Sequence, residues 1–185
     1  MKYLEEFELA IERSRYLKLS DTRFKALDAK FCSDENLQSC LDFLNYLYNP
    51  LKGTDLVGQC LNIHSQLMKA VEHFYGAPPI FTIGSITFDG NKYFELAEDD
   101  IKSSILDCSP TNMANIHAWL TLPSMEILDF TFISTYESQA GDSGFPKVVS
   151  QFAESLKPHF HYHPVLTGEE SLSKLGLSSS GYHLF

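Results

Sequence analysis

Residues 115–131 read NIHAWLTLPSMEILDFT, two apolar segments on either side of a short turn at Pro123-Ser124. This pattern predicts a β-hairpin. With the turn centred on those two residues, antiparallel pairing sets residue 117 opposite residues 129 to 131. His117 near the start of the first strand and Asp129 near the end of the second are therefore expected to be cross-strand neighbours.

The composition of the whole chain indicates one globular domain. A length of 185 residues suits a single domain. The apolar share of 44% is ordinary for a globular protein and allows a sizeable core. The 14 Phe and 9 Tyr residues argue against disorder.

The charge balance disfavours some classes of partner. The chain has 14 Lys and Arg against 24 Asp and Glu, for a net charge of -10. This balance disfavours nucleic acid and anionic membrane surfaces as partners. The N-terminal residues MKYLEE lack the apolar run of a signal peptide, and no stretch approaches the length of a membrane span. A cytoplasmic location is expected, with signal-independent secretion left open.

The four cysteines, Cys32, Cys40, Cys60 and Cys108, show no CxxC spacing and are expected to be free thiols. Cys32 and Cys40 are interpreted as small core residues. Cys60 differs, because it begins a predicted helix over residues 58–75 that Gly76 closes.

Hydrophobic patterning assigns a helix or a strand to most of the chain. Helical spacing predicts helices over residues 3–18, 21–31, 33–48, 58–75 and 148–156, with a short helix from residue 98 left open. Alternation predicts strands over residues 80–88, 93–96, 126–134 and 159–164 besides the first strand of the hairpin. Loops are expected at residues 49–58, 109–112 and 136–146.

The order of these elements predicts an α+β fold in which helices come first, antiparallel strands follow and helices return late. No internal repeat and no linker divides the chain. We therefore expect a single domain over residues 1–185. It would comprise a helical N-terminal subregion at 1–50, a core of helix and antiparallel sheet at 55–135, and a C-terminal extension at 145–185.

Cys60, His117 and Asp129 together form a pattern with chemical meaning. A helix N-terminus favours the thiolate form of cysteine. A histidine can shuttle the thiol proton, and a carboxylate beside it fixes its tautomer and stabilises its protonated form. The three residues thus supply the nucleophile, the base and the orienting group of a Cys-His-Asp triad.

This order of residues resembles the papain-like superfamily in its transglutaminase and arylamine N-acetyltransferase branch. The resemblance covers about residues 55–133 and includes the wording H-x-W-L from His117 and I-L-D-x-T around Asp129. It implies a catalytic Cys60 at the head of a helix packed on an antiparallel sheet that carries the other two residues. Leu61 stands where the family often has a tryptophan, so the family's acyl-donor and acceptor pockets cannot be transferred.

The resemblance implies a thiol-dependent acyl-transfer enzyme, acting as a peptidase, amidase, deamidase or transferase without a cofactor. Its substrate would be a peptide, a protein side-chain amide or a small acyl compound. The Cys60 backbone N–H would hold the oxyanion together with a second donor, for which Gln59 and Asn62 are candidates by proximity. His64 and Trp119 are expected to line the site.

Two other interpretations remain open at this point, and a third is dismissed. In the first, the chain is a non-catalytic interaction module of the same fold, in which Cys60 is a buried thiol and His117 and Asp129 are structural. Alternatively, Cys60 and His64 share one helix face and bind zinc with His117, as in a metal-dependent hydrolase. Finally, Gly141 to Pro146 read GDSGFP, similar to the Ser-containing motif of trypsin-like proteases. The spacings are too short for that fold, so a surface turn at Ser143 is preferred.

A second histidine cluster lies near the C-terminus. His159, His161 and His163 alternate along a predicted strand and so share one face, which can bind a metal ion. Phe160 and Tyr162 occupy the other face. A strand with exposed histidines and buried aromatic residues is the simpler interpretation.

Overall fold

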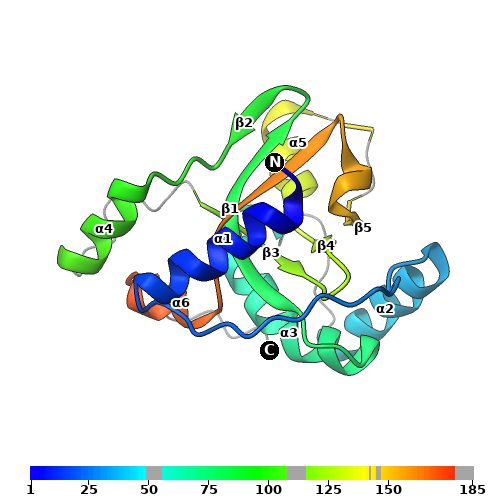
Figure 1. Cartoon of the computed structure of the whole chain (residues 1–185). Helices are drawn as coiled ribbons and strands as arrows, with labels where there is room; N and C mark the ends of the chain where they lie inside the picture. Colours follow the sequence, from blue (N-terminus) through cyan, green and yellow to red (C-terminus); the bar gives the residue numbers. More distant parts are fainter. Residues whose placement is uncertain (49–55, 108–115, 142, 145–146, 178–185) are drawn as a thin grey trace.

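The computed structural model describes residues 1–48, 56–107, 116–141, 143–144 and 147–177 (Figure 1). Within these residues the chain forms six α-helices and a six-stranded antiparallel sheet, so the predicted α+β class is confirmed. In this described part of the chain no helix is both long and apolar enough to cross a membrane. The predictions for Cys108, the loop 109–112 and most of the loop 49–58 fall outside the described residues.

The helices are α1 (Tyr3–Tyr16), α2 (Asp34–Tyr48), α3 (Cys60–Tyr75), α4 (Glu98–Asp107), α5 (Phe132–Ala140) and α6 (Glu170–Lys174). The strands are β1 (Ile80–Phe88), β2 (Asn91–Tyr93), β3 (His117–Thr121), β4 (Glu126–Asp129), β5 (Val149–Phe152) and β6 (Phe160–Thr167). A short 3-10 helix, η3 (Ala153–Leu156), follows β5.

The long strand β1 is the centre of the sheet. It pairs with β6 on one side and with β3 and β2 on the other, while β4 and β5 extend the sheet beyond β3. A side chain at Gly84 of β1 would collide with the backbone oxygen of His163 and lie 2.8 Å from the Trp119 ring. Glycine therefore allows β6 and Trp119 to approach β1 closely. The C-terminal region thus contributes two strands, β5 and β6, to the sheet.

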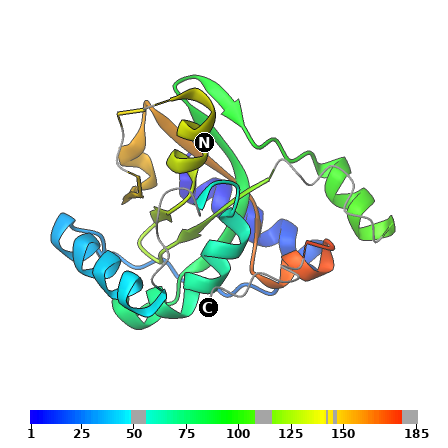
Figure 2. The same cartoon turned by 180° about the vertical axis from the view of Figure 1, so that it is seen from behind.

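Helices α1 and α3 lie on opposite sides of the sheet, as the two views show (Figures 1 and 2). Helix α3 packs on β3 and β1 over an aliphatic core that includes Ile83, Ala118 and Leu120. The other side holds an aromatic core that includes Trp119 and Tyr162. Strict alternation along β3 therefore puts His117 and Trp119 on the aromatic side and their neighbours on the aliphatic side.

Helix α1 also covers the free edge of β6. The Arg13 guanidinium donates to the Val165 carbonyl at 2.9 Å, and the Thr167 N–H donates to Ser14 Oγ at 2.8 Å. Side chains of a helix thus satisfy backbone groups that an edge strand would otherwise expose, which protects the edge from pairing with another chain.

The prediction of a helix over residues 21–31 is wrong. This segment is irregular because its backbone groups find partners in the hairpin rather than in a helix. The Leu27 N–H donates to the Pro123 carbonyl at 2.9 Å, and the N–H groups of Phe31 and Cys32 donate to the carboxylate of Glu126. Glu126 is fully buried, so these hydrogen bonds replace its water shell.

Three more predicted elements differ in their bounds or their type. The strand expected over 126–134 ends at Asp129, and α5 then occupies much of the expected loop 136–146. The helix expected over 148–156 is β5 followed by η3, because residues 149–152 pair with β4. The return strand expected over 93–96 ends at Tyr93, since the next residue has a positive φ of 62°.

Candidate active site

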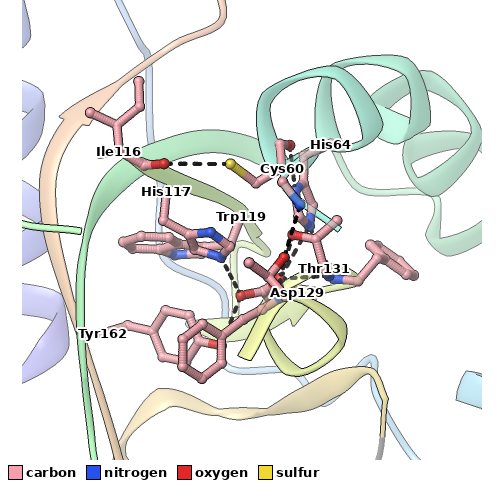
Figure 3. Close-up of polar contacts among 12 residues, drawn as sticks. Cys60, His64, Ile116, His117, Trp119, Asp129, Thr131 and Tyr162 are labelled. Atoms are coloured by element: carbon pink, nitrogen blue, oxygen red, sulfur yellow. Dashed lines mark hydrogen bonds and ion pairs between the residues drawn. The ribbon is translucent and has the colours of Figure 1, made fainter. Parts of the chain in front are cut away.

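Cys60, His117 and Asp129 lie at one end of the sheet (Figure 3). Cys60 is the first residue of α3, His117 the first of β3 and Asp129 the last of β4. His117 Nε2 lies 2.6 Å from Asp129 Oδ2, in a hydrogen bond between two buried side chains. The Cys60 sulfur lies at the opposite end of the imidazole, close enough to interact with it.

The position of Cys60 is set by the turn that precedes α3. Gly58 has a φ of 69°, which a residue with a side chain adopts only with strain, and its N–H donates to Thr135 Oγ1 of α5 at 3.1 Å. In its protonated form, the Cys60 thiol donates to the Ile116 carbonyl at 3.6 Å, immediately before β3. The start of α3 is therefore fixed against both the start of β3 and the start of α5.

Asp129 is held by five hydrogen bonds. Oδ2 accepts from His117 and from the Tyr162 hydroxyl at 3.0 Å. Oδ1 accepts from the N–H groups of Thr131 and Phe132 at 2.9 and 3.0 Å and from the Thr131 hydroxyl at 3.3 Å. These contacts also start α5, because they satisfy donors in its first turn.

The two buried partners change each other's protonation. Burial alone would raise the pKa of Asp129, but the charge of His117 and the hydrogen bonds lower it well below its usual range. Burial alone would lower the pKa of His117, but the charge of Asp129, the charge of Cys60 and hydrogen bonds to both raise it to about 10. Both shifts favour an imidazolium beside a carboxylate over two neutral partners.

His64 lies beside the same carboxylate but is neutral. Its Nδ1 donates to the Cys60 carbonyl at 2.7 Å, and its Nε2 accepts from the Phe130 N–H at 3.1 Å. Burial, reinforced by the charge of His117 and opposed by that of Asp129, lowers its pKa to about 4. The 3.7 Å between His64 Nε2 and Asp129 Oδ1 is thus a contact without a proton, not an ion pair.

These bonds argue against the zinc interpretation. Both ring nitrogens of His64 are engaged with backbone groups, so neither is free to bind a metal ion together with Cys60 and His117. Among the described residues, the metal-binding geometry found is elsewhere, on α1 and β6. His64 instead connects the first turn of α3 to the backbone after β4.

Aromatic side chains surround His117. Phe94 stacks on its ring with centroids 4.8 Å apart and an interplanar angle of 24°. Trp119 lies 6.2 Å away at 25°, and Phe132 meets the ring edge-on at 5.8 Å. Trp119 is fully buried and donates from Nε1 to the Tyr3 hydroxyl, so it supports His117 from within the core rather than lining an open site.

The two proposed oxyanion donors lie on either side of Cys60. Gln59 is the N-cap residue of α3 and is half-buried. The side-chain oxygen of Asn62 accepts a hydrogen bond from Gln66 Nε2 at 2.7 Å, which directs that oxygen along the helix.

Ser143 donates to Glu137 Oε1 at 2.6 Å, in agreement with the interpretation of a surface turn.

A hollow of about 350 Å³ lies behind the aromatic residues that contact His117. Phe94 and Phe132 form part of its wall, with the rest of the wall from β2 and α5. Phe94 therefore separates the hollow from the imidazole. A larger hollow of about 520 Å³ is lined by residues such as Ser65, Pro79 and Glu169, and its described wall includes none of the three triad residues.

Sequence reasoning missed Tyr162 and Phe94 as parts of the site. Tyr162 was expected only as a buried aromatic on its strand, and its contact with Asp129 depends on β6 pairing with β1. Phe94 carries an unusual positive φ that no sequence pattern reveals.

No protein-family model, no curated protein and no solved structure matched this chain, so the geometry of these residues is the basis for its proposed function.

Proposed function

We propose that this protein is a thiol-dependent acyl-transfer enzyme of the papain and transglutaminase-like type, with Cys60 as nucleophile, His117 as proton carrier and Asp129 as orienter. The observation that supports it most is the buried 2.6 Å contact between His117 and Asp129, with the Cys60 thiol at the other end of the same ring. A buried imidazolium stabilises a thiolate beside it through a Coulomb attraction that water screens little.

The first half of the reaction forms an acyl-enzyme. The thiolate attacks the carbonyl carbon of an amide or thioester, a C–S bond forms, and the carbonyl electron pair moves to oxygen. The oxyanion accepts a hydrogen bond from the Cys60 N–H, which as a first-turn group has no acceptor within α3. When the carbonyl re-forms, the leaving group departs with the proton from His117 Nδ1.

The second half regenerates the thiolate. Neutral His117 takes a proton from water or from an amine, which attacks the thioester carbon. The C–S bond breaks, and the enzyme returns to its thiolate and imidazolium. Water gives hydrolysis and an amine gives acyl transfer. Asp129 keeps the proton on Nε2 throughout, so that Nδ1 alone exchanges protons.

An acylation assay tests the proposal. The folded protein is incubated with a panel of activated acyl donors, such as aryl esters and thioesters of short peptides, and intact and peptide masses are recorded. We expect one acyl group on Cys60 and loss of this adduct in Cys60→Ser. The matched control is Cys32→Ser, because Cys32 is equally buried and burial raises the pKa of its thiol to about 11.

The alternative of a non-catalytic module has two observations in its favour. Phe94 covers one face of His117, and Cys60 is only 7% exposed. If no donor in the panel acylates Cys60 in either the wild type or a Phe94→Ala variant that opens this face, the enzyme proposal is contradicted and the module is favoured.

A further inference from the structure

A second group of ionisable side chains lies on α1 and β6, away from Cys60. Glu6 projects from α1, and His161 and His163 project from the same face of β6. His159, the third histidine of the predicted cluster, is not part of the group, because its Nδ1 pairs with Asp89 at 2.8 Å.

The donor atoms of this group converge. His161 Nε2 lies 3.2 Å from Glu6 Oε1, and His163 Nδ1 lies 3.2 Å from Glu6 Oε2. The two rings are side by side with centroids 3.9 Å apart, and one ligand atom from each of the three residues lies within 4.8 Å of the others. Nitrogen and oxygen ligands around a tetrahedral zinc ion are about 3.3–3.6 Å apart, since each lies about 2.0–2.2 Å from the metal.

The orientation of the His161 ring relative to Glu6 suggests that both side chains are directed at a common ligand, such as a metal ion. Its Nε2 is buried and makes no hydrogen bond of acceptable geometry, although it is within 3.2 Å of Glu6. A nitrogen that is close to a carboxylate oxygen but poorly directed at it is expected when both atoms point at a common centre. A buried ring nitrogen without a hydrogen bond is otherwise costly.

The other ring nitrogen of His163 is fixed as in known metal sites. His163 Nε2 lies 2.9 Å from Thr87 Oγ1 on the neighbouring strand β1. Histidines that bind a metal usually donate their second N–H to an oxygen, which sets the tautomer and orients the ring. Without a metal, His163 Nδ1 donates to Glu6 Oε2 at 3.2 Å and Thr87 donates to Nε2. A metal ion at Nδ1 would shift the proton to Nε2, where Thr87 Oγ1 can accept it.

We propose that Glu6, His161 and His163 bind a divalent transition metal ion, of which Zn²⁺ is the best match, at the junction of α1 and β6. Two imidazoles and one carboxylate are a ligand set that zinc accepts, and they leave a fourth position for water. The set is unsuited to Mg²⁺ or Ca²⁺, which prefer oxygen ligands alone.

The surroundings of the site agree with this assignment. The three side chains are 16–29% exposed, so an ion can enter from solvent. The nearby cation Lys157 is paired with Glu154 at 3.0 Å, which offsets its repulsion of a bound ion. A bound ion would tie α1 to the edge strand that it covers.

Metal titration of the full chain, purified without a histidine tag, tests the proposal. Because the chain has four cysteines, Co²⁺ is used as well as Zn²⁺. Thiolate ligands give Co²⁺ an intense near-ultraviolet band that nitrogen and oxygen ligands do not. We expect one equivalent of Co²⁺ bound without that band, displaced by Zn²⁺ and not by Mg²⁺.

Variants distinguish this site from adventitious binding. His161→Gln, His163→Gln and Glu6→Gln keep side-chain size and should each weaken Zn²⁺ binding more than about 100-fold, beyond the 10–100-fold cost of a change that only orients a ligand. Thr87→Val should weaken it about 10-fold. His159→Gln, in the turn just before β6, is the matched control and should bind like the wild type.

Two results would overturn the assignment. One is the absence of stoichiometric binding by the folded wild type at micromolar Zn²⁺. The other is binding that the three glutamine variants leave unchanged while their thermal melts show a folded protein. Either result would leave the group as a simple pair of ion contacts between α1 and β6, and neither bears on the acylation of Cys60.

Discussion

Two histidine and carboxylate groups in this protein differ in their access to water, and this difference decides what each can do. His117 and Asp129 are at most 1% exposed, so their attraction is little screened and the imidazole keeps its proton. His161 and His163 are 27% and 29% exposed beside Glu6, and the pKa of His161 is lowered rather than raised. The buried pair holds a proton, whereas a cation can reach the partly exposed group from solvent.

Breaking the buried pair should have the largest effect. In Asp129→Asn the tautomer of His117 is no longer set by a carboxylate and its pKa falls toward its ordinary value. Acylation of Cys60 should slow by about 10⁴-fold, the size of loss that a triad shows when its orienting carboxylate becomes an amide. The rate is measured by mass spectrometry with the best acyl donor. Glu6→Gln, the matched change in the partly exposed group, should leave the rate within about twofold; equal losses in both variants would contradict the comparison.

His117 and His161 should titrate at different pH values. The folded-state pKa of His117 is raised from 6.5 to about 10. Its contribution to stability is therefore fully present below pH 6.5 and is lost as the pH rises through about 10. Ring NMR signals assigned by His117→Gln and His161→Gln should show His117 titrating near pH 10 and His161 titrating below its ordinary value. A His117 that titrates near 6.5 would remove the imidazolium from the mechanism.

Truncating Asp129 and truncating Glu6 should lower the free energy of unfolding by different amounts. Asp129→Ala leaves a buried imidazole and several donors without a partner, which costs about 3–5 kcal/mol. Glu6→Ala removes a partly exposed carboxylate from contacts that are partly screened, which costs about 1 kcal/mol or less without added metal. Urea denaturation in a metal-free buffer measures both. Similar losses would show that burial does not distinguish the groups.

The smallest effect in the buried group should come from Tyr162. Tyr162→Phe removes one of the five hydrogen bonds of Asp129, the 3.0 Å bond to Oδ2. A hydrogen bond to a charged group contributes about 1.5–3 kcal/mol, so unfolding should become easier by that amount and acylation should slow about tenfold. His159→Gln is the surface control, because exposed ion pairs contribute about 1 kcal/mol or less. A Tyr162→Phe variant that behaves like this control would remove Tyr162 from the site.

The sequence could predict those parts of the fold and site that depend on local signals. The turn at Pro123-Ser124 gives the pairing of β3 with β4, and Gly76 closes α3 in a left-handed conformation at its predicted place. The convergence of His117 with Asp129 follows from the hairpin alone, because the register that pairs Leu120 with Leu128 makes the two residues diagonal neighbours across the strands. The start of α3 at Cys60 has a local signal as well, since Gly58 marks the preceding turn.

The missed features depend on contacts between distant segments. The local pattern of segment 21–31 predicts a helix. In the structure, Glu126, nearly a hundred residues later, accepts backbone hydrogen bonds from the end of this segment instead. The local pattern of residues 149–152 predicts part of a helix, but in the structure these residues pair with β4 as a strand. Tyr162 reaches Asp129 only because β6 lies beside β1. Tertiary contacts override local propensity in all three cases.

The most direct test of the central claim compares the alkylation rates of Cys60 and Cys32 in the folded protein at pH 7. The two thiols are matched in access, at 7% and 6% exposed, but only Cys60 lies beside the His117 imidazolium. With iodoacetamide and site-resolved mass spectrometry, Cys60 should react about 100-fold faster or more, and His117→Gln should remove most of this advantage. Equal rates for Cys60 and Cys32 in the wild type would contradict the proposed thiolate and imidazolium pair.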